Sequence, residues 1–219
     1  MNPAHIKVLS AAVEVSFPRP VAWTPSLLEE SVSRLVDALG FPLRSDQVRV
    51  RHSDILYNYD LTATFFNGNA LFTRNADKMS LYLNNAQEDE QKVVFDILER
   101  FGGLLSTGTR LPIQLLVTAH VDIGSQQNRQ QFLKRYSPSE RVELPGAVAY
   151  LPSKLSGDGV DHIRFMIEPS LSLPEALFVS WRANLPSPED WKNRIKLVLE
   201  SFEEAARVYD LLIRFPSQE

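Results

Sequence analysis

The clearest hydrophobic pattern in the chain is helical and lies near its end, between Ser187 and Phe215. Apolar residues recur there at alternating spacings of four and three, which places them along one side of a helix. They are Trp191, Ile195, Val198, Phe202, Ala205, Tyr209 and Leu212. Ser187 is a favourable N-cap, and Pro188 suits the first helical position. We therefore expect a helix about 40 Å long, at roughly 1.5 Å per residue, whose first part covers its own half of the chain and whose last turns reach the other half or a second subunit.

The other helical segments are shorter, and the first has recognisable ends. Thr24 is an N-cap followed by Pro25, and Gly40 is typical of a helix C-terminus. Helical spacing of apolar residues predicts a second helix over residues 88–101 and a more polar one over 126–136.

Elsewhere the pattern changes to the alternation of apolar and polar residues that is typical of strands. Strands are predicted over residues 6–17, 44–52, 56–66, 112–123, 146–151, 162–168 and 177–183, with one interrupted strand or two short ones between 70 and 83. Asn67-Gly68-Asn69 tolerates the backbone angles of a hairpin turn. Most connections between consecutive strands are too short for a parallel crossover. The predicted fold class is α+β, a mainly antiparallel sheet with helices on one face.

The order of elements suggests that the chain contains a repeat. Residues 1–105 and 106–219 each give strand, helix, three strands and helix, and the second half ends in the long helix. The segment 104–110 is small and contains glycine and hydroxyl residues, which favours a boundary there. The hypothesis is an internal duplication of two β-α-β-β-β-α halves, either as two units or merged into one domain.

Composition excludes several classes of protein. The chain has 219 residues, of which 44% are hydrophobic and 23% charged, as in ordinary globular proteins. Its net charge of -4 without a long basic run argues against nucleic acid as a partner. The lack of cysteine excludes disulfides, thiol nucleophiles and cysteine-ligated metal clusters. Because neither a signal peptide nor a long apolar run is visible, we expect a soluble, cytoplasmic protein without a membrane segment.

Motifs for catalysis and for cofactors are missing. The chain contains no GxGxxG, GxxxxGK[ST], GxSxG or HExxH sequence. Asp158, Asp161 and His162 could ligate a metal, but their glycine-rich surroundings favour a turn. His120 and Asp122 share one side of a strand, where a carboxylate could orient an imidazole, yet no nucleophile is identifiable. We therefore expect no metal, no cofactor and no enzyme activity, with an unrecognised hydrolase or transferase left open because catalytic sites are defined by geometry.

The most informative cluster combines aromatic and amide side chains within the first predicted sheet. Rings supply contact area and amides supply directional hydrogen bonds, so the cluster predicts a surface for a ligand or a partner. The predicted site residues are Tyr57, Tyr59, Phe65, Asn67, Asn69, Arg74, Tyr82 and Asn84. Arg74 would suit an anionic partner. The alternative is that the rings form core and the asparagines form turns.

Two functions follow from these observations. The first is a non-enzymatic protein-interaction or assembly module, which binds a protein partner or associates with itself. The second is a binder of a small, mostly apolar ligand between the sheet and the C-terminal helix, which would need a cavity of roughly 300 Å³ or more.

Overall fold

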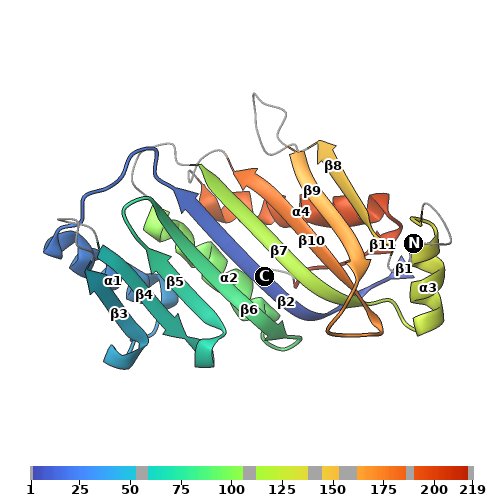
Figure 1. The fold of residues 1–219 in the computed structure, drawn as a ribbon, viewed down its shortest axis with the longest axis horizontal. Helices are drawn as coiled ribbons and strands as arrows, with labels where there is room; N and C mark the ends of the chain where they lie inside the picture. Colours follow the sequence, from blue (N-terminus) through green and yellow to red (C-terminus); the bar gives the residue numbers. More distant parts are fainter. Residues whose placement is uncertain are drawn as a thin grey trace.

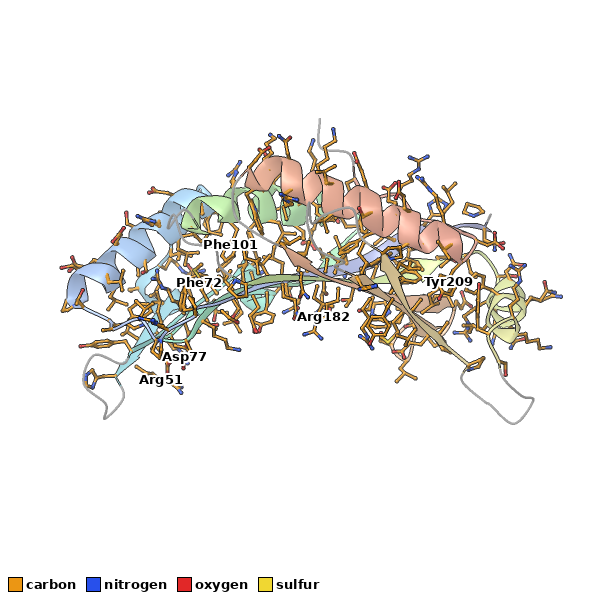
Figure 2. All side chains as sticks on the ribbon, turned by 90° about the horizontal axis from the view of Figure 1, so that it is seen from above. Arg51, Phe72, Asp77, Phe101, Arg182 and Tyr209 are labelled. Atoms are coloured by element: carbon orange, nitrogen blue, oxygen red, sulfur yellow. The ribbon has the colours of Figure 1, made fainter. Side chains whose placement is uncertain are left out.

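The computed structural model describes residues 2–52, 59–105, 112–137, 145–152, 162–185 and 190–216. These residues form one large sheet with helices on one of its faces (Figures 1 and 2). In chain order the elements are β1 (Asn2–Pro3), β2 (His5–Ser16), α1 (Pro25–Leu39), η1 (Ser45–Gln47), β3 (Val48–His52), β4 (Tyr59–Phe65), η2 (Phe66–Gly68), β5 (Ala70–Arg74), β6 (Lys78–Gln87), α2 (Gln91–Phe101), η3 (Gly102–Leu105), β7 (Ile113–Asp122), α3 (Gln126–Lys134), β8 (Ala147–Pro152), β9 (His162–Pro169), β10 (Ala176–Leu185), α4 (Trp191–Val208) and β11 (Leu211–Leu212).

The strands from both halves of the chain belong to one sheet. Within the described residues it has nine strands in the order β3-β4-β5-β6-β2-β7-β10-β9-β8, and each neighbouring pair is antiparallel. The first strands of the two halves, β2 and β7, pair at the centre from His5 opposite Asp122 to Val15 opposite Ile113. The α+β, mainly antiparallel architecture is therefore confirmed.

In both halves, the strands that follow outward from this central pair are arranged in the reverse of their order along the chain. On one side β2 is followed by β6, β5 and β4, and on the other β7 is followed by β10, β9 and β8. The first half has four strands after α1 where the repeat scheme counts three, because the segment between residues 70 and 83 forms the second of the two predicted alternatives, two strands with a sharp turn between them. There the side-chain oxygen of Asn75 accepts from the backbone nitrogens of Asp77 (3.0 Å) and Lys78 (2.9 Å). The internal duplication and its division at residue 105 stay predictions.

Helix α1 has the ends that its sequence predicts. The hydroxyl of Thr24 accepts from the backbone nitrogen of Leu27 at 3.2 Å. Gly40 has a φ of 74°, and its N–H donates to the carbonyl of Val36 at 2.9 Å. These contacts satisfy backbone groups that a helix leaves unpaired at its termini.

The terminal helix is shorter than predicted. Helix α4 ends at Val208, Asp210 adopts a positive φ of 60°, and the chain continues as β11, which pairs in parallel with β1. Leu211 and Ile213 stay completely buried beyond the helix. The last apolar residues of the predicted helix therefore belong to a short extended segment, in which alternate residues are buried. The predicted cap, Ser187 with Pro188, lies outside the described residues.

The chain contacts its other half at both ends of α4, whereas the sequence predicted such a contact only at the last turns. Its first residue, Trp191, contacts the other half of the chain, because the indole Nε1 donates to the carbonyl of Leu98 in α2 at 2.7 Å. After the helix ends, the ring of Tyr209 packs on Phe165 of β9 in its own half, with ring centroids 5.2 Å apart. The two halves are thus joined at the start of α4 and again beyond its end, where Leu211 and Leu212 pair with Asn2 and Pro3 of β1.

Candidate functional site: the open face of the sheet

Three of the predicted site residues lie on the helix-covered side of the sheet. Tyr59 and Phe65 alternate with exposed residues along β4 and pack against the core. Phe65 is only 1% exposed and makes an edge contact with Phe41 at a centroid distance of 6.0 Å. It is therefore unavailable to a partner, as the core interpretation predicts. Tyr57 lies outside the described residues.

Arg74 is the third of these residues, and its charge is enclosed beneath α1. Its guanidinium lies 5.0 Å from the ring centroid of Trp23 and 5.7 Å from that of Phe17, and it donates to the hydroxyl of Ser31 at 2.7 Å. Burial lowers the pKa of Arg74, and repulsion from Arg34 lowers it further. Cation–π contacts replace part of the lost hydration. Arg74 therefore joins β5 to α1, and its ion-binding role stays untested.

Asn67, Asn69 and Asn84 do lie together, around a pocket of about 280 Å³ beside the N-terminal half of α2. Their side-chain amides make no hydrogen bond within the part of the chain that the structure describes. Phe66, on the rim, is 42% exposed and has a positive φ of 49°. The apolar lining comes from Leu83, Ala86, Val93, Val94 and Ile97. The pocket's volume is slightly below the range of roughly 300–1,000 Å³ that is typical of ligand sites.

The opposite face of the sheet carries no helix among the described residues. In Figure 2 the sheet arches, and its convex side faces α1, α2 and α4, so the open face is concave. One row of side chains crosses this face in register on eight neighbouring strands. The row contains Thr64, Leu71, Tyr82, Ala12, Leu116, Arg182, Arg164 and Tyr150. Tyr82, the remaining predicted site residue, thus belongs to a surface that spans both halves.

The second half of the open face is unusually apolar for an exposed surface. On the last strand, β8, Val148 is 51% and Tyr150 66% exposed. Beside them lie the half-buried side chains of Met166, Phe178 and Leu116, on β9, β10 and β7. Together with Arg164 and Arg182 these residues form what we call the aromatic–arginine patch.

The arginines of this patch have no carboxylate partner within the described residues. Arg164 contacts the sulfur of Met166 at 3.8 Å, and Arg182 donates to the side-chain oxygen of Gln114. Lys78, elsewhere on this face, is neutralised locally, since its ammonium lies 3.1 Å from the carboxylate of Glu14. The patch therefore combines apolar side chains with two uncompensated positive charges.

Sequence reasoning missed this patch because β7 and β10 have apolar residues on both faces. Leu115 and Leu116 are adjacent in β7, yet only the first is buried. The available signal was the alternation in β8, where Val148 and Tyr150 alternate with alanines. That signal shows which residues share a face but not which face the helices cover.

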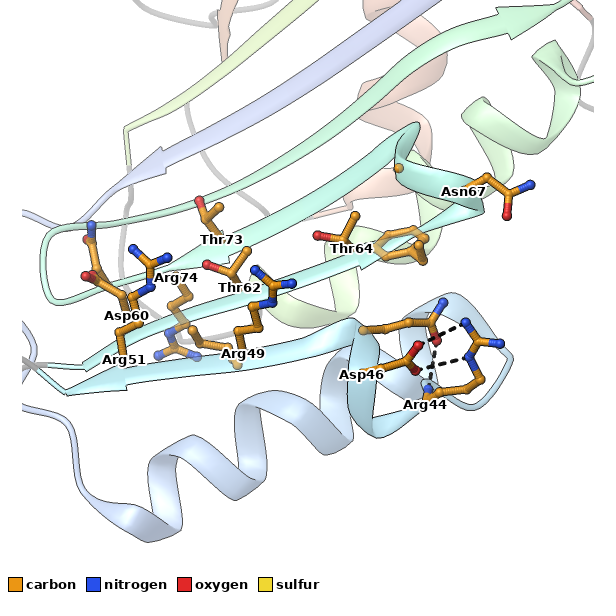
Figure 3. A pocket seen from close by; sticks show the side chains of 15 residues that line it. Arg44, Asp46, Arg49, Arg51, Asp60, Thr62, Thr64, Asn67, Thr73 and Arg74 are labelled. Carbon is orange, nitrogen blue, oxygen red and sulfur yellow. Dashed lines mark hydrogen bonds and ion pairs between the residues drawn. The ribbon is translucent and has the colours of Figure 1, made fainter.

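A second hollow lies on the first half of the open face, at β3, β4 and β5 (Figure 3). It measures about 680 Å³. Arg49 and Arg51 come from β3, with Thr62 and Thr64 from β4 and Thr73 from β5. On its rim Arg44 forms an ion pair with Asp46 at 3.2 Å. We call this hollow the arginine–threonine pocket.

The predicted pairing of Asp122 with His120 does not occur. The imidazole Nδ1 lies 2.9 Å from the hydroxyl of Ser170 and Nε2 lies 3.5 Å from that of Ser172. The carboxylate of Asp122 instead accepts from the backbone of Gly124 at 2.7 Å. Ser170 is 5% exposed and also accepts from the backbone of Leu173, so its hydroxyl stabilises the β9–β10 turn. Without a carboxylate orienting the ring, this pair lacks the geometry of a hydrolase triad.

His120 should make stability depend on pH. Burial lowers the pKa of His120 below its ordinary value of 6.5, so the unfolded chain binds the proton more readily than the folded one. Stability should be fully present above about pH 6.5 and fall as pH decreases through that value. His120→Gln should lose less stability than the wild type between about pH 8 and pH 5, measured by chemical denaturation at each pH. Ser172→Ala, which retains the imidazole, should show the same dependence of the free energy of unfolding on pH as the wild type. If His120→Gln also showed the wild-type dependence, His120 would not be its source.

The metal ligands considered in the sequence lie only partly within the described residues. Within the ranges that the structure describes, no three His, Asp or Glu side chains are grouped so that they could hold an ion. His162 is exposed at the start of β9, whereas Asp158 and Asp161 lie outside those ranges. Likewise, none of the described helices is long and apolar enough to cross a membrane.

The chain matches no protein-family model, and no curated protein resembles it in sequence.

Proposed function

We propose that this chain is a protein-interaction module, and that the aromatic–arginine patch binds a protein partner which presents apolar side chains interspersed with carboxylates. The observation that carries the proposal is the exposure of Val148 and Tyr150 beside Arg164 and Arg182, which lack carboxylate partners in the described part of the chain. Aromatic residues, methionine and arginine are enriched at protein interfaces. Contiguous exposed apolar surface of this kind is typical of such sites.

Charge complementarity specifies the chemistry of the partner. An arginine surrounded by apolar groups loses water when a partner covers it, and a carboxylate on the partner would replace that hydration with paired hydrogen bonds. A neutral or basic partner would leave both guanidiniums buried and uncompensated. The concave shape of the face in Figure 2 suits a convex partner surface.

The alternative function, an apolar ligand between the sheet and α4, is less well supported. Trp181 and Phe202 stack across this interface with centroids 5.9 Å apart, and both are 0% exposed. The indole Nε1 of Trp181 donates to the carbonyl of Phe202 at 2.9 Å. Such close packing favours a structural role for these residues.

Site-specific photo-crosslinking in the native host tests the proposal. A photoreactive phenylalanine analogue at Tyr150 should form an adduct with one discrete protein. The same analogue at Val208, which is 67% exposed at the end of α4 on the helix side, is the matched control and should not form it. Charge reversal by Arg164→Glu with Arg182→Glu should reduce the Tyr150 adduct by about tenfold or more, as expected for loss of desolvated charge pairs.

Two results would contradict the proposal: equal adducts from both positions, or a Tyr150 adduct that charge reversal leaves unchanged. The reversed variant must retain the wild-type circular dichroism spectrum and denaturation midpoint, so that loss of the adduct reports on binding. An adduct with a second copy of this chain identifies self-association as the interaction, within the same proposal.

A further inference from the structure

We propose that the arginine–threonine pocket binds a phosphate monoester through Arg49 and Arg51. The pocket lies at the opposite end of the open face from the aromatic–arginine patch, so this inference does not rest on the proposed interaction function.

The strand geometry directs both arginines to the same side. Arg49 and Arg51 alternate along β3, the outermost described strand at this end of the sheet, so their Cα atoms are roughly 7 Å apart and their side chains share the open face. Figure 3 shows Arg49 above the strands together with Thr62, Thr64 and Thr73. Four hydrogen-bonding side chains from three strands therefore surround one hollow.

The two guanidiniums are available to a ligand. Among the described residues neither Arg49 nor Arg51 forms an ion pair, whereas Arg44 on the rim is neutralised by Asp46 at 3.2 Å. Asp60 lies opposite Arg51 in the register of β3 and β4 but forms no ion pair with it. Both arginines are exposed, so a ligand can reach them from solvent.

Hydroxyl groups complete a set of donors that suits phosphate. Thr62 lies opposite Arg49 in register and Thr73 lies opposite Thr62. The hydroxyl of Thr73 is 2.7 Å from that of Ser80, while those of Thr62 and Thr64 make no hydrogen bond in the described part of the chain. Two guanidiniums and two free hydroxyls offer more donors than the two oxygens of a carboxylate can use. They match the three terminal oxygens of a phosphate monoester.

The remaining features of the pocket specify an organic ester over free phosphate. The volume of about 680 Å³ leaves room for more than a phosphate group. Asp60 offers an exposed acceptor beside the arginines, and a hydroxyl or amide N–H group of an ester would donate to it and so offset the repulsion between this carboxylate and the phosphate. The ligand class is therefore a phosphate monoester that also carries a hydrogen-bond donor, either as a small molecule with hydroxyl groups or as a phosphorylated side chain of a protein with its backbone amide N–H groups.

Titration calorimetry with defined probes tests this inference. The probes are glucose 6-phosphate, O-phospho-L-serine in an N-acetylated, C-amidated form, inorganic phosphate, and the unphosphorylated glucose and serine counterparts. At least one ester should bind about tenfold or more tightly than inorganic phosphate, and the unphosphorylated counterparts should not bind. Preference for the sugar ester assigns the site to a small molecule, and preference for the blocked phosphoserine assigns it to a phosphorylated protein.

Matched variants locate the binding. Arg49→Gln and Arg51→Gln should each weaken ester binding by about tenfold or more, because each removes a charge-assisted contact. Arg182→Gln, the same substitution in the aromatic–arginine patch, should leave the affinity unchanged. No ester binding up to about 10 mM, affinity no better than that of inorganic phosphate, or affinity insensitive to Arg49→Gln and Arg51→Gln would each overturn the inference. Because both arginines are exposed, the variants should denature at the wild-type midpoint.

Discussion

Trp181→Ala should lower the free energy of unfolding by about 3–5 kcal/mol, the usual cost of truncating a large buried aromatic residue. Trp181 is 0% exposed, stacks on Phe202 and makes an edge contact with Phe215 at a centroid distance of 5.4 Å. Removal of the indole also leaves the carbonyl of Phe202 without its hydrogen bond from Trp181. Urea denaturation followed by circular dichroism would measure the change.

The next residue along β10 provides the matched control. Arg182 points to the open face and is exposed, so Arg182→Ala should change the free energy of unfolding by less than about 1 kcal/mol. If Trp181→Ala and Arg182→Ala lowered the free energy of unfolding by similar amounts, both faces of β10 would be covered to a similar extent. That result would contradict the description of the open face.

Gly102→Ala should lower the free energy of unfolding by about 3 kcal/mol, at the upper end of the usual cost of overpacking. A Cβ atom at Gly102 would lie 2.2 Å from Cδ1 and 2.7 Å from Cβ of Trp191. The backbone of Gly102 is helical, with a φ of -53°, so alanine is conformationally acceptable and the cost comes from the collision. Relief of this collision would require a shift of the start of α4, where the indole of Trp191 is hydrogen-bonded to the carbonyl of Leu98.

Gly68→Ala separates this collision from backbone strain. A Cβ there would meet no atom within 4 Å, but φ is +92°, which disfavours alanine. Its expected cost is about 1–2 kcal/mol, the usual penalty for a residue with a Cβ in the left-handed region, again measured by urea denaturation. If Gly68→Ala proved as destabilising as Gly102→Ala, steric contact with Trp191 would not be the cause.

The predicted binding cluster was partly recoverable from sequence. Asn67, Asn69 and Asn84 do surround one pocket, because a hairpin brings its turn beside the end of the next strand. Phe65 and Tyr82, placed in the same cluster, lie on opposite faces of the sheet. Alternation along a strand separates such residues into two sets, one for each face of the sheet. When both sets contain aromatic rings, the sequence of the strand does not show which face a helix will cover.

The aromatic–arginine patch and the arginine–threonine pocket were beyond sequence reasoning for a similar reason. Arg164 and Arg182 are 18 positions apart in the chain and meet because β9 and β10 pair in one particular register. Arg49 lies in a strand that the sequence predicts over residues 44–52, but its threonine neighbours come from two other strands. Register depends on contacts over the whole sheet.

The sequence by itself determined the elements, their antiparallel class and the ends of α1, because alternation, helical spacing and the caps Thr24 and Gly40 act over a few neighbouring residues. Only the tertiary structure decided where α4 stops, since Leu211 and Leu212 leave the helix to pair with β1, more than 200 residues away. It also decided that one concave face stays open. That outcome depends on how α1, α2 and α4 pack together on the other side, which is a property of the whole molecule.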